Sequence, residues 1–225
     1  MERIFVFGAG GHAKVAMDAI ERQGLYKVAF LVDDAATRAG RALDDHCVLG
    51  GRAELIRMRE ECGIERGIVA VGDNGARNKI AGWLIANGFG LVRVVHPSAT
   101  LAGGASIGAG SVVMAGAVVN TGAIIGRNAI VNTGAIVDHD CFVGDTAHIA
   151  PGATLCGSVS GGDGALVGAG AVVIQGGSIG RCAVVGAGSA VIDDVPDGFV
   201  VAGAPARAIS GSACLKAGAI GKSSL

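Results

Sequence analysis

One short segment of the sequence combines side chains that could move a proton. It reads Val137-Asp138-His139-Asp140-Cys141-Phe142, and His148 follows nine residues after His139. Histidine has an ordinary pKa of about 6.5, so a neutral imidazole can accept a proton near neutral pH. A carboxylate bonded to the second ring nitrogen fixes the tautomer and stabilises the imidazolium. The segment predicts a general base at His139 with Asp138 or Asp140 as its partner; the alternative is two surface histidines without chemistry.

A second candidate site lies near the N-terminus, in the run Gly8-Ala9-Gly10-Gly11-His12-Ala13 after the apolar stretch Ile4–Phe7. A glycine-rich turn that opens a helix binds phosphate through free N–H groups and the helix dipole. The run also has the form of a dinucleotide fingerprint, with Asp33 at 23 residues after Gly10. The turn alone does not specify a dinucleotide, so a sugar nucleotide diphosphate is favoured and NAD is the alternative. Asp33 and Asp34 could bind base or ribose, or could fill ordinary strand-end roles.

The elements around this loop alternate between strand and helix patterns up to about residue 94. Apolar runs predict strands at 4–7, 28–32, 68–71 and 91–95, and amphipathic stretches predict helices at 15–23, 54–62 and 74–86, the last capped by Asn74. Such alternation is typical of βαβ units. Residues 1–94 are therefore predicted to form a Rossmann-like α/β domain with a parallel sheet. Within this domain, residues 38–46 are predicted to form a surface loop.

The rest of the chain has a six-residue period. Counted in sixes from Val95 to Val191, sixteen of the seventeen first positions are aliphatic, and only Gly161 departs. The fifth position of almost every hexad is small. An aliphatic residue every six positions and a small one near each corner predict stacked coils with a continuous core. Residues 95–210 are therefore predicted to form an all-β parallel β-helix; a rigid scaffold without chemistry is the alternative.

Composition narrows the class of protein. The chain has 225 residues with 18 basic and 19 acidic side chains and no basic block, so a nucleic-acid partner is not expected. No apolar run reaches the roughly 18 residues of a membrane helix, and the N-terminus lacks a signal-peptide pattern. The six cysteines form no C-x-x-C pair. These features favour a cytoplasmic protein with reduced thiols and no metal site.

Taken together, the motifs resemble one family over residues 3–210: the bacterial nucleotide-4-amino-sugar N-acetyltransferases and sialic-acid O-acetyltransferases, which are hexapeptide-repeat acyltransferases. The matching pieces are 7–14, 32–34, 71–74, 96–99, 132–135, 137–141, 148–152 and 203–207. The resemblance implies a left-handed β-helix with three hexads per coil, a homotrimer with catalytic sites between neighbouring β-helices, and acetyl-CoA as co-substrate. Some members carry Glu after the base where this chain has Asp140, which shortens the arm without changing its role.

The resemblance also assigns residues. It implies that His139 is the base and Asp140 its partner. The implied acetyl-CoA-binding residues are His148, Asn132, Gly157, Gly168, Gly186, Pro205 and Arg207. The implied substrate-binding residues are Gly8, Gly10, Gly11, His12, Lys14, Asp33, Asp34, Asp73 and Asn74.

These expectations combine into one hypothesis. Residues 1–94 bind a nucleotide-linked (UDP or GDP) 4-amino-4,6-dideoxy sugar, 95–210 bind acetyl-CoA, and 211–225 form a tail without chemistry. The sugar amine attacks the thioester directly, because no Cys or Ser stands in an evident nucleophile arrangement. Such an enzyme serves polysaccharide or glycan biosynthesis. The alternatives are O-acetylation of a sialic-acid-type hydroxyl and a non-catalytic nucleotide-sugar-binding protein.

Overall fold

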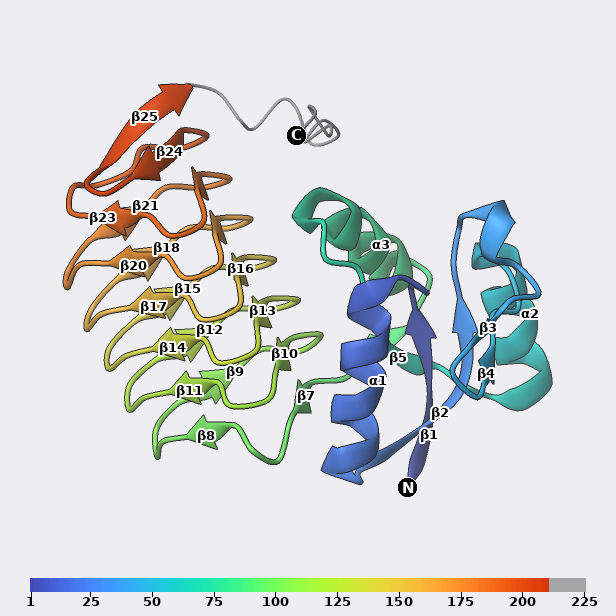
Figure 1. Cartoon of the computed structure of the whole chain (residues 1–225). Helices are drawn as coiled ribbons and strands as arrows, with labels where there is room; N and C mark the ends of the chain where they lie inside the picture. Colours follow the sequence, from blue (N-terminus) through green and yellow to red (C-terminus); the bar gives the residue numbers. More distant parts are fainter. Residues whose placement is uncertain (211–225) are drawn as a thin grey trace.

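The computed structural model describes residues 1–210 and has two parts that lie side by side (Figure 1). In the N-terminal part, four parallel strands pair in the order β2-β1-β5-β6. Their bounds are β1 Glu2–Phe7, β2 Tyr26–Val32, β5 Arg66–Val69 and β6 Gly90–Leu91. The helices are α1 Gly11–Gln23, α2 Arg52–Cys62 and α3 Asn74–Ala86.

Side chains alternate along β1, which explains why helices cover both faces of the sheet. Ile4 and Val6 join the core that contains the buried residues of α1. Phe5 and Phe7 join the opposite core, which contains Leu55 of α2 and residues of α3. The core under α1 continues into the β-helix, where outward-facing apolar side chains complete it: Val94, Val112, Met114 and Ile130. The two parts therefore share one apolar interface.

Three local predictions for this part are corrected by the structure. The cap of α3 is Asp73, whose carboxylate accepts from Ala76 N at 2.7 Å, and not Asn74. The predicted strand at 91–95 is two strands in different sheets, because β6 ends at Leu91 and Val94–Val95 already belongs to the β-helix. The predicted loop at 38–46 follows the 3-10 turn η1 (Ala36–Arg38) and contains a small antiparallel pair, β3 (Ala42–Leu43) with β4 (His46–Cys47).

The second part is a parallel β-helix of about six coils, as the hexad pattern predicts. Its strands form three sheets, which we call the domain face, the second face and the third face. The domain face contains β7 (Val94–Val95), β10 (Val112–Val113), β13 (Ile130–Val131), β16 (His148–Ile149), β19 (Leu166–Val167), β22 (Val184–Val185) and β24 (Val200–Gly203), with β25 (Ala206–Ser210) antiparallel at its end.

The second face contains β8 (Thr100–Leu101), β11 (Val118–Val119), β14 (Ile136–Val137), β17 (Thr154–Leu155), β20 (Val172–Val173) and β23 (Ala190–Val191). The third face contains β9 (Ser106–Ile107), β12 (Ile124–Ile125), β15 (Phe142–Val143), β18 (Ser160–Gly161) and β21 (Ser178–Ile179). Paired residues lie 18 positions apart, for example Val119 and Val137, except between β22 and β24, where Val184 pairs with Val200, 16 positions away.

The hexad positions have distinct structural roles. The aliphatic first positions point inward, and the small fifth positions, such as Ala135 and Ala147, are fully buried inside the corners. In every hexad except the first and the last, the fourth position turns a corner in the left-handed region, which glycine adopts without strain. Five hexads carry another residue there: Asn128, Asp140, Thr146, Ser158 and Cys182. Asp140 therefore stands at a position where most hexads have glycine. The predicted tail, 211–225, lies outside the described residues.

Candidate active site

His139 lies on the corner between the second and third faces, after β14. Its ring Nδ1 is 2.9 Å from Asp140 Oδ2, and both side chains are exposed, at 54% and 66% of their surface. Asp138 is occupied elsewhere, because its Oδ1 accepts from Asn120 Nδ2 at 2.7 Å and from the backbone N of His139 at 2.8 Å. Of the two flanking carboxylates, Asp140 is therefore the one that contacts the ring.

The charge around His139 alters how it binds a proton. The hydrogen bond to Asp140, with the nearby charge of Asp138, raises the pKa of the His139 imidazole. The bonds from His139 N and Asn120 lower the pKa of the Asp138 carboxyl. With Asp140 holding the proton on Nδ1, the free lone pair of His139 is on Nε2. The arrangement can accept a proton at Nε2 and stabilise the resulting charge.

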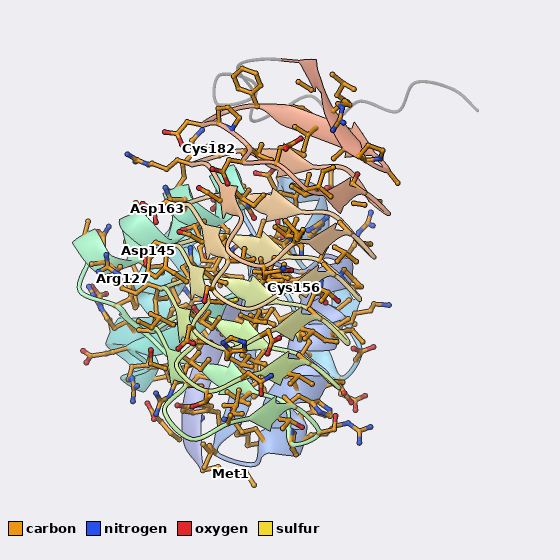
Figure 2. All side chains as sticks on the ribbon, turned by 90° about the vertical axis from the view of Figure 1, so that its left-hand side faces the viewer. Met1, Arg127, Asp145, Cys156, Asp163 and Cys182 are labelled. Carbon is orange, nitrogen blue, oxygen red and sulfur yellow. The ribbon has the colours of Figure 1, made fainter. Side chains whose placement is uncertain are left out.

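Gly157 stacks on His139 in the next coil and leaves room for its ring. A Cβ atom at Gly157 would lie 2.5 Å from His139 Nε2 and 2.6 Å from Cε1. The neighbouring Cys141 thiol donates to the Cys156 carbonyl at 3.1 Å, and burial raises its pKa, so it is a poor thiolate nucleophile. In Figure 2, Cys156 marks this part of the β-helix surface, away from the edge that carries Arg127, Asp145 and Asp163.

A second cluster forms where the domain face of the β-helix meets the N-terminal part. His148, at the start of β16, has its Nε2 3.1 Å from Asn132 Nδ2. His12, from the start of α1, interacts with it electrostatically. Burial, with the charge of Arg77, lowers the pKa of both His12 and His148 to about 4. Both imidazoles are therefore neutral near pH 7. As predicted, His139 and His148 occupy different sides of one β-helix.

The glycine loop connects β1 to α1. Gly8 has φ of +114°, and a Cβ there would lie 2.7 Å from Ala70 O, so only glycine fits. At Gly10, the helix begins without a side-chain cap and with no acidic residue in its first turn. Gly11 has open space above it. The free N–H groups of this turn are suited to a phosphate.

Asp33 braces this loop through three hydrogen bonds. Its carboxylate accepts from Ala9 N at 2.8 Å, from Ala35 N at 2.9 Å and from Arg38 Nη1 at 2.6 Å. These bonds outweigh burial and lower the pKa of the Asp33 carboxyl. The Arg38 guanidinium lies over Gly10, 3.5 Å from the position that a Cβ would take there. Arg38 thus adds a positive charge to the loop, which the sequence did not indicate because nothing in its spacing links it to Gly10.

The remaining predicted substrate residues have varied surroundings. Lys14 is exposed, and Asp34 pairs with Arg52 at 3.0 Å on the surface. Asp73 caps α3, whereas Asn74 donates from Nδ2 to the carbonyls of Gly164 and Ala165 in the β-helix at 2.9 and 3.1 Å. Asp73 and Asn74 thus have structural partners within the chain.

The other predicted cofactor residues lie higher on the β-helix. At Gly168 and Gly186 the next coil is too close for a side chain, since a Cβ would lie 2.6 Å from Ala187 N and 2.9 Å from Ala202 Cβ respectively. Pro205 follows a cis peptide bond in the β24–β25 turn. Arg207 lines a pocket of about 180 Å³ together with Asp193, Phe199 and others. The last coils therefore provide a hollow lined by Arg207 and by the carboxylates of Asp193 and Asp194, the first of which pairs with Arg207 at 3.5 Å.

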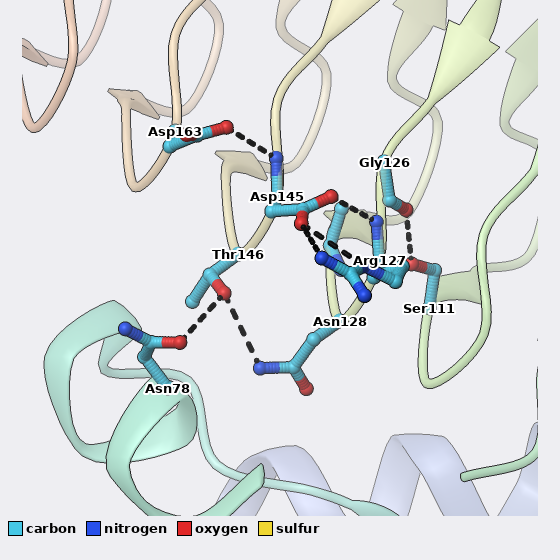
Figure 3. Close-up of polar contacts among 9 residues, drawn as sticks. Asn78, Ser111, Gly126, Arg127, Asn128, Asp145, Thr146 and Asp163 are labelled. Carbon is cyan, nitrogen blue, oxygen red and sulfur yellow. Dashed lines mark hydrogen bonds and ion pairs between the residues drawn. The ribbon is translucent and has the colours of Figure 1, made fainter. Parts of the chain in front are cut away.

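A ladder of polar contacts fixes the corner that carries the second cluster. Asp145 accepts from Arg127 N at 2.7 Å and pairs with its guanidinium, and Asp163 accepts from Asp145 N at 2.9 Å. Beneath it, Thr146 links Asn128 of the previous coil to Asn78 of α3, with both contacts at 3.4 Å (Figure 3). The ladder ends two residues before His148, so it helps to place that imidazole against the N-terminal part.

Comparison with known proteins places this geometry in context. The PglD N-terminal domain model matches residues 3–84. Perosamine N-acetyltransferase from Caulobacter crescentus, solved with CoA and GDP-perosamine, is 40% identical, with a TM-score of 0.89 over 93% of this chain and 98% of that one. The chain belongs to the family of β-helix sugar acetyltransferases. It is an acyltransferase, a sugar N-acetyltransferase, and its relatives were solved with CoA or acetyl coenzyme A bound.

Two further structures agree. The acetyltransferase domain of PglB from Neisseria gonorrhoeae, in complex with acetyl coenzyme A, is 38% identical, with a TM-score of 0.85 over 92% of this acetyltransferase and 99% of that chain. WeeI from Acinetobacter baumannii is 28% identical, with a TM-score of 0.83 over 92% and 100%. No curated protein sequence matches the chain significantly.

Two further properties follow from residues 1–210. They contain no group of three or more His, Cys, Asp or Glu side chains that could hold a metal ion. None of the helices in this range is both long and apolar enough to cross a membrane.

Proposed function

We propose that this enzyme transfers the acetyl group of acetyl-CoA to the 4-amino group of a nucleotide-linked 4-amino-4,6-dideoxy sugar, with His139 as the general base. The observation that carries the proposal is the contact of 2.9 Å between His139 Nδ1 and Asp140 Oδ2, which leaves Nε2 free beside Gly157. GDP is the favoured nucleotide, because a relative of 40% identity was solved with GDP-perosamine.

The chemistry follows from this geometry. The neutral sugar amine attacks the thioester carbonyl, and a C–N bond forms as the carbonyl oxygen gains negative charge. His139 Nε2 takes the proton that the attacking nitrogen must lose, and Asp140 stabilises the imidazolium. The C–S bond then breaks, the thiolate of CoA leaves, and the imidazolium returns its proton to the sulfur. The Asn132 amide, whose Nδ2 lies 3.1 Å from His148 Nε2, is proposed to keep its second N–H for the negative charge on the carbonyl oxygen.

We further propose that the site is completed between subunits of a homotrimer. His139 and His148 lie on different sides of one β-helix, so a site that contains both requires a neighbouring copy. Exposed apolar side chains flank the His139 corner on the second and third faces: Ile124, Ile136, Phe142, Val172 and Ile174. An apolar surface of this kind is typical of a subunit contact.

The nucleotide is proposed to bind at the glycine loop. The uncapped N-terminus of α1 offers N–H groups to the diphosphate, and Arg38 lies over Gly10. Asp33 is proposed to hold this loop in shape, since its oxygens already accept from Ala9, Ala35 and Arg38. Asp34 and Lys14 remain exposed at the edge of the same site.

A mixing experiment tests the shared site. His139→Ala and His148→Ala chains are purified separately, then unfolded and refolded together. If the site lies between subunits, mixed trimers regain activity because some interfaces contain both wild-type histidines. Each variant refolded alone is the control. Mixed trimers, verified by a mass tag on one chain, that stay as inactive as the separate variants would contradict a shared site.

A further inference from the structure

Arg77 is a buried cation at the junction of the two parts. It lies in α3 and is only 1% exposed. Its guanidinium donates to neutral acceptors throughout: Val71 O, Gly72 O, Asn74 Oδ1, Asn128 O, Thr146 O and Ala147 O, at 2.7 to 3.4 Å. Among the described residues it has no ion-pair partner within 4.0 Å, although Asp73 contributes favourably from further away. Burying a charge without an ion pair is costly, so a role beyond packing is expected.

The contacts of Arg77 lead to His148 through one carbonyl. Thr133 N donates to Asn132 Oδ1 at 2.8 Å, so the Asn132 amide must point its NH2 group at His148. His148 Nε2 is therefore an acceptor, and its proton is on Nδ1. The backbone of Gly72 favours the protonated form of the His148 ring, so the group that faces the ring is the Gly72 carbonyl. Arg77 Nη1 donates to the same oxygen at 3.0 Å.

We propose that Arg77 is a positioning residue for acetyl transfer: it holds the Gly72 carbonyl and the coil corners at Asn128 and Thr146, and so fixes one orientation and one tautomer of His148. The inference rests on the proposed function only in placing His148 at the transfer site. The Nδ1 tautomer is favoured from two sides, by the Asn132 amide at Nε2 and by the Gly72 carbonyl, and Arg77 acts on the second of these. Arg77 also disfavours a proton on His148, whose pKa is lowered to about 4, first by burial and then by this charge.

Arg77→Met and Arg77→Lys test the inference on the full-length enzyme. Lysine keeps the charge but cannot reproduce the planar set of donors, and methionine removes both. A misplacement of His148 by about 1 Å is expected to lower kcat about 10²-fold in Arg77→Met, with a smaller loss in Arg77→Lys. KM for acetyl-CoA should change less than about threefold in both. Arg59→Met is the matched control, because Arg59 donates to Asn87 O at 2.6 Å and covers Phe89 away from the site.

Nitrogen NMR of histidine-labelled protein separates positioning from general stability. We expect wild-type His148 to be protonated on Nδ1 alone near pH 7. In Arg77→Met it should populate both tautomers and titrate at higher pH, and in Arg77→Lys it should keep its low pKa with a mixed tautomer. A folded Arg77→Met enzyme with wild-type kcat and a single Nδ1 tautomer would overturn the inference. If Arg77→Met does not fold, an unchanged kcat and an unchanged His148 tautomer in Arg77→Lys would also overturn the inference.

The NMR result does not depend on the substrate. A changed tautomer together with an active His139→Ala enzyme would reject the proposed base and support the role of Arg77. An unchanged His148 tautomer in an Arg77 variant, together with an inactive His139→Ala enzyme, would support the proposed base and reject the role of Arg77.

Discussion

Gly157→Ala should impair catalysis by displacing the base. The added Cβ would lie 2.5 Å from His139 Nε2 and 2.6 Å from Cε1, whereas ordinary contacts of this kind are about 3.5 Å. The imidazole must therefore move by about 1 Å, which is enough to cost about 10²-fold in kcat when a catalytic group is misplaced. Because His139 is half exposed, its ring has room to rotate, and the protein should still fold.

The assay is release of CoA, followed with a thiol reagent while each substrate is varied in turn. Gly103→Ala is the control, because Gly103 is in the same β-helix with nothing within 4 Å of its added Cβ. We expect kcat to fall in Gly157→Ala alone, with melting temperatures close to wild type in both. A kcat of Gly157→Ala equal to that of Gly103→Ala would refute the placement of the base. A rise only in KM for acetyl-CoA would mean that Gly157 serves the cofactor instead.

Three further predictions follow from the site. Asp140→Asn removes the charge that raises the pKa of His139. The fall of kcat at acidic pH should therefore occur at lower pH than in the wild type, and kcat should be reduced at least about tenfold. If the pH at which kcat falls does not change, another group titrates. Asp33→Ala frees Ala9 N and Arg38, so KM for the nucleotide sugar should rise about tenfold without a change in KM for acetyl-CoA, and equal changes in both would argue against a nucleotide site at this loop. Asp73→Ala removes the cap of α3 and should cost about 1 kcal/mol in the free energy of unfolding, measured in urea, while kcat stays unchanged; a large loss of kcat in a stable protein would make Asp73 a site residue.

Periodic features of the fold were predictable from the sequence. The hexads place Val137 inward and Ala135 inside a corner. Each coil must bury the same positions, so the same residue types recur every six residues in the sequence. The last residues of the three helices were predicted correctly, but α1 begins at Gly11, four residues before the predicted start, and α2 begins two residues before it. The cap of α3 was wrong because both Asp73 and Asn74 are good caps, and the choice depends on Asn74 bonding to the β-helix.

The candidate site was predictable only where its parts are close in sequence. His139 and Asp140 are adjacent, and the glycine loop is one continuous segment. Arg38 and Arg77 were missed, since their roles depend on residues brought near by folding: Arg77 donates to Asn128 and Thr146, 51 and 69 positions away. No local pattern marks such a residue. The spacing alone left Asp138 and Asp140 as equal partners of His139, and only the family resemblance favoured Asp140. In the structure, the hydrogen bond from Asn120 to Asp138 distinguishes them.

The most direct test of the central claim is CoA release from acetyl-CoA by wild type and His139→Ala, with a panel of GDP- and UDP-linked 4-amino-4,6-dideoxy sugars and with sialic acid. We predict rapid release by the wild type with one amino-sugar nucleotide, and a loss of about 10²- to 10⁴-fold in kcat in the variant, with its oligomeric state intact. Release with sialic acid alone would contradict the proposed acceptor. Full turnover by His139→Ala would contradict the proposed base.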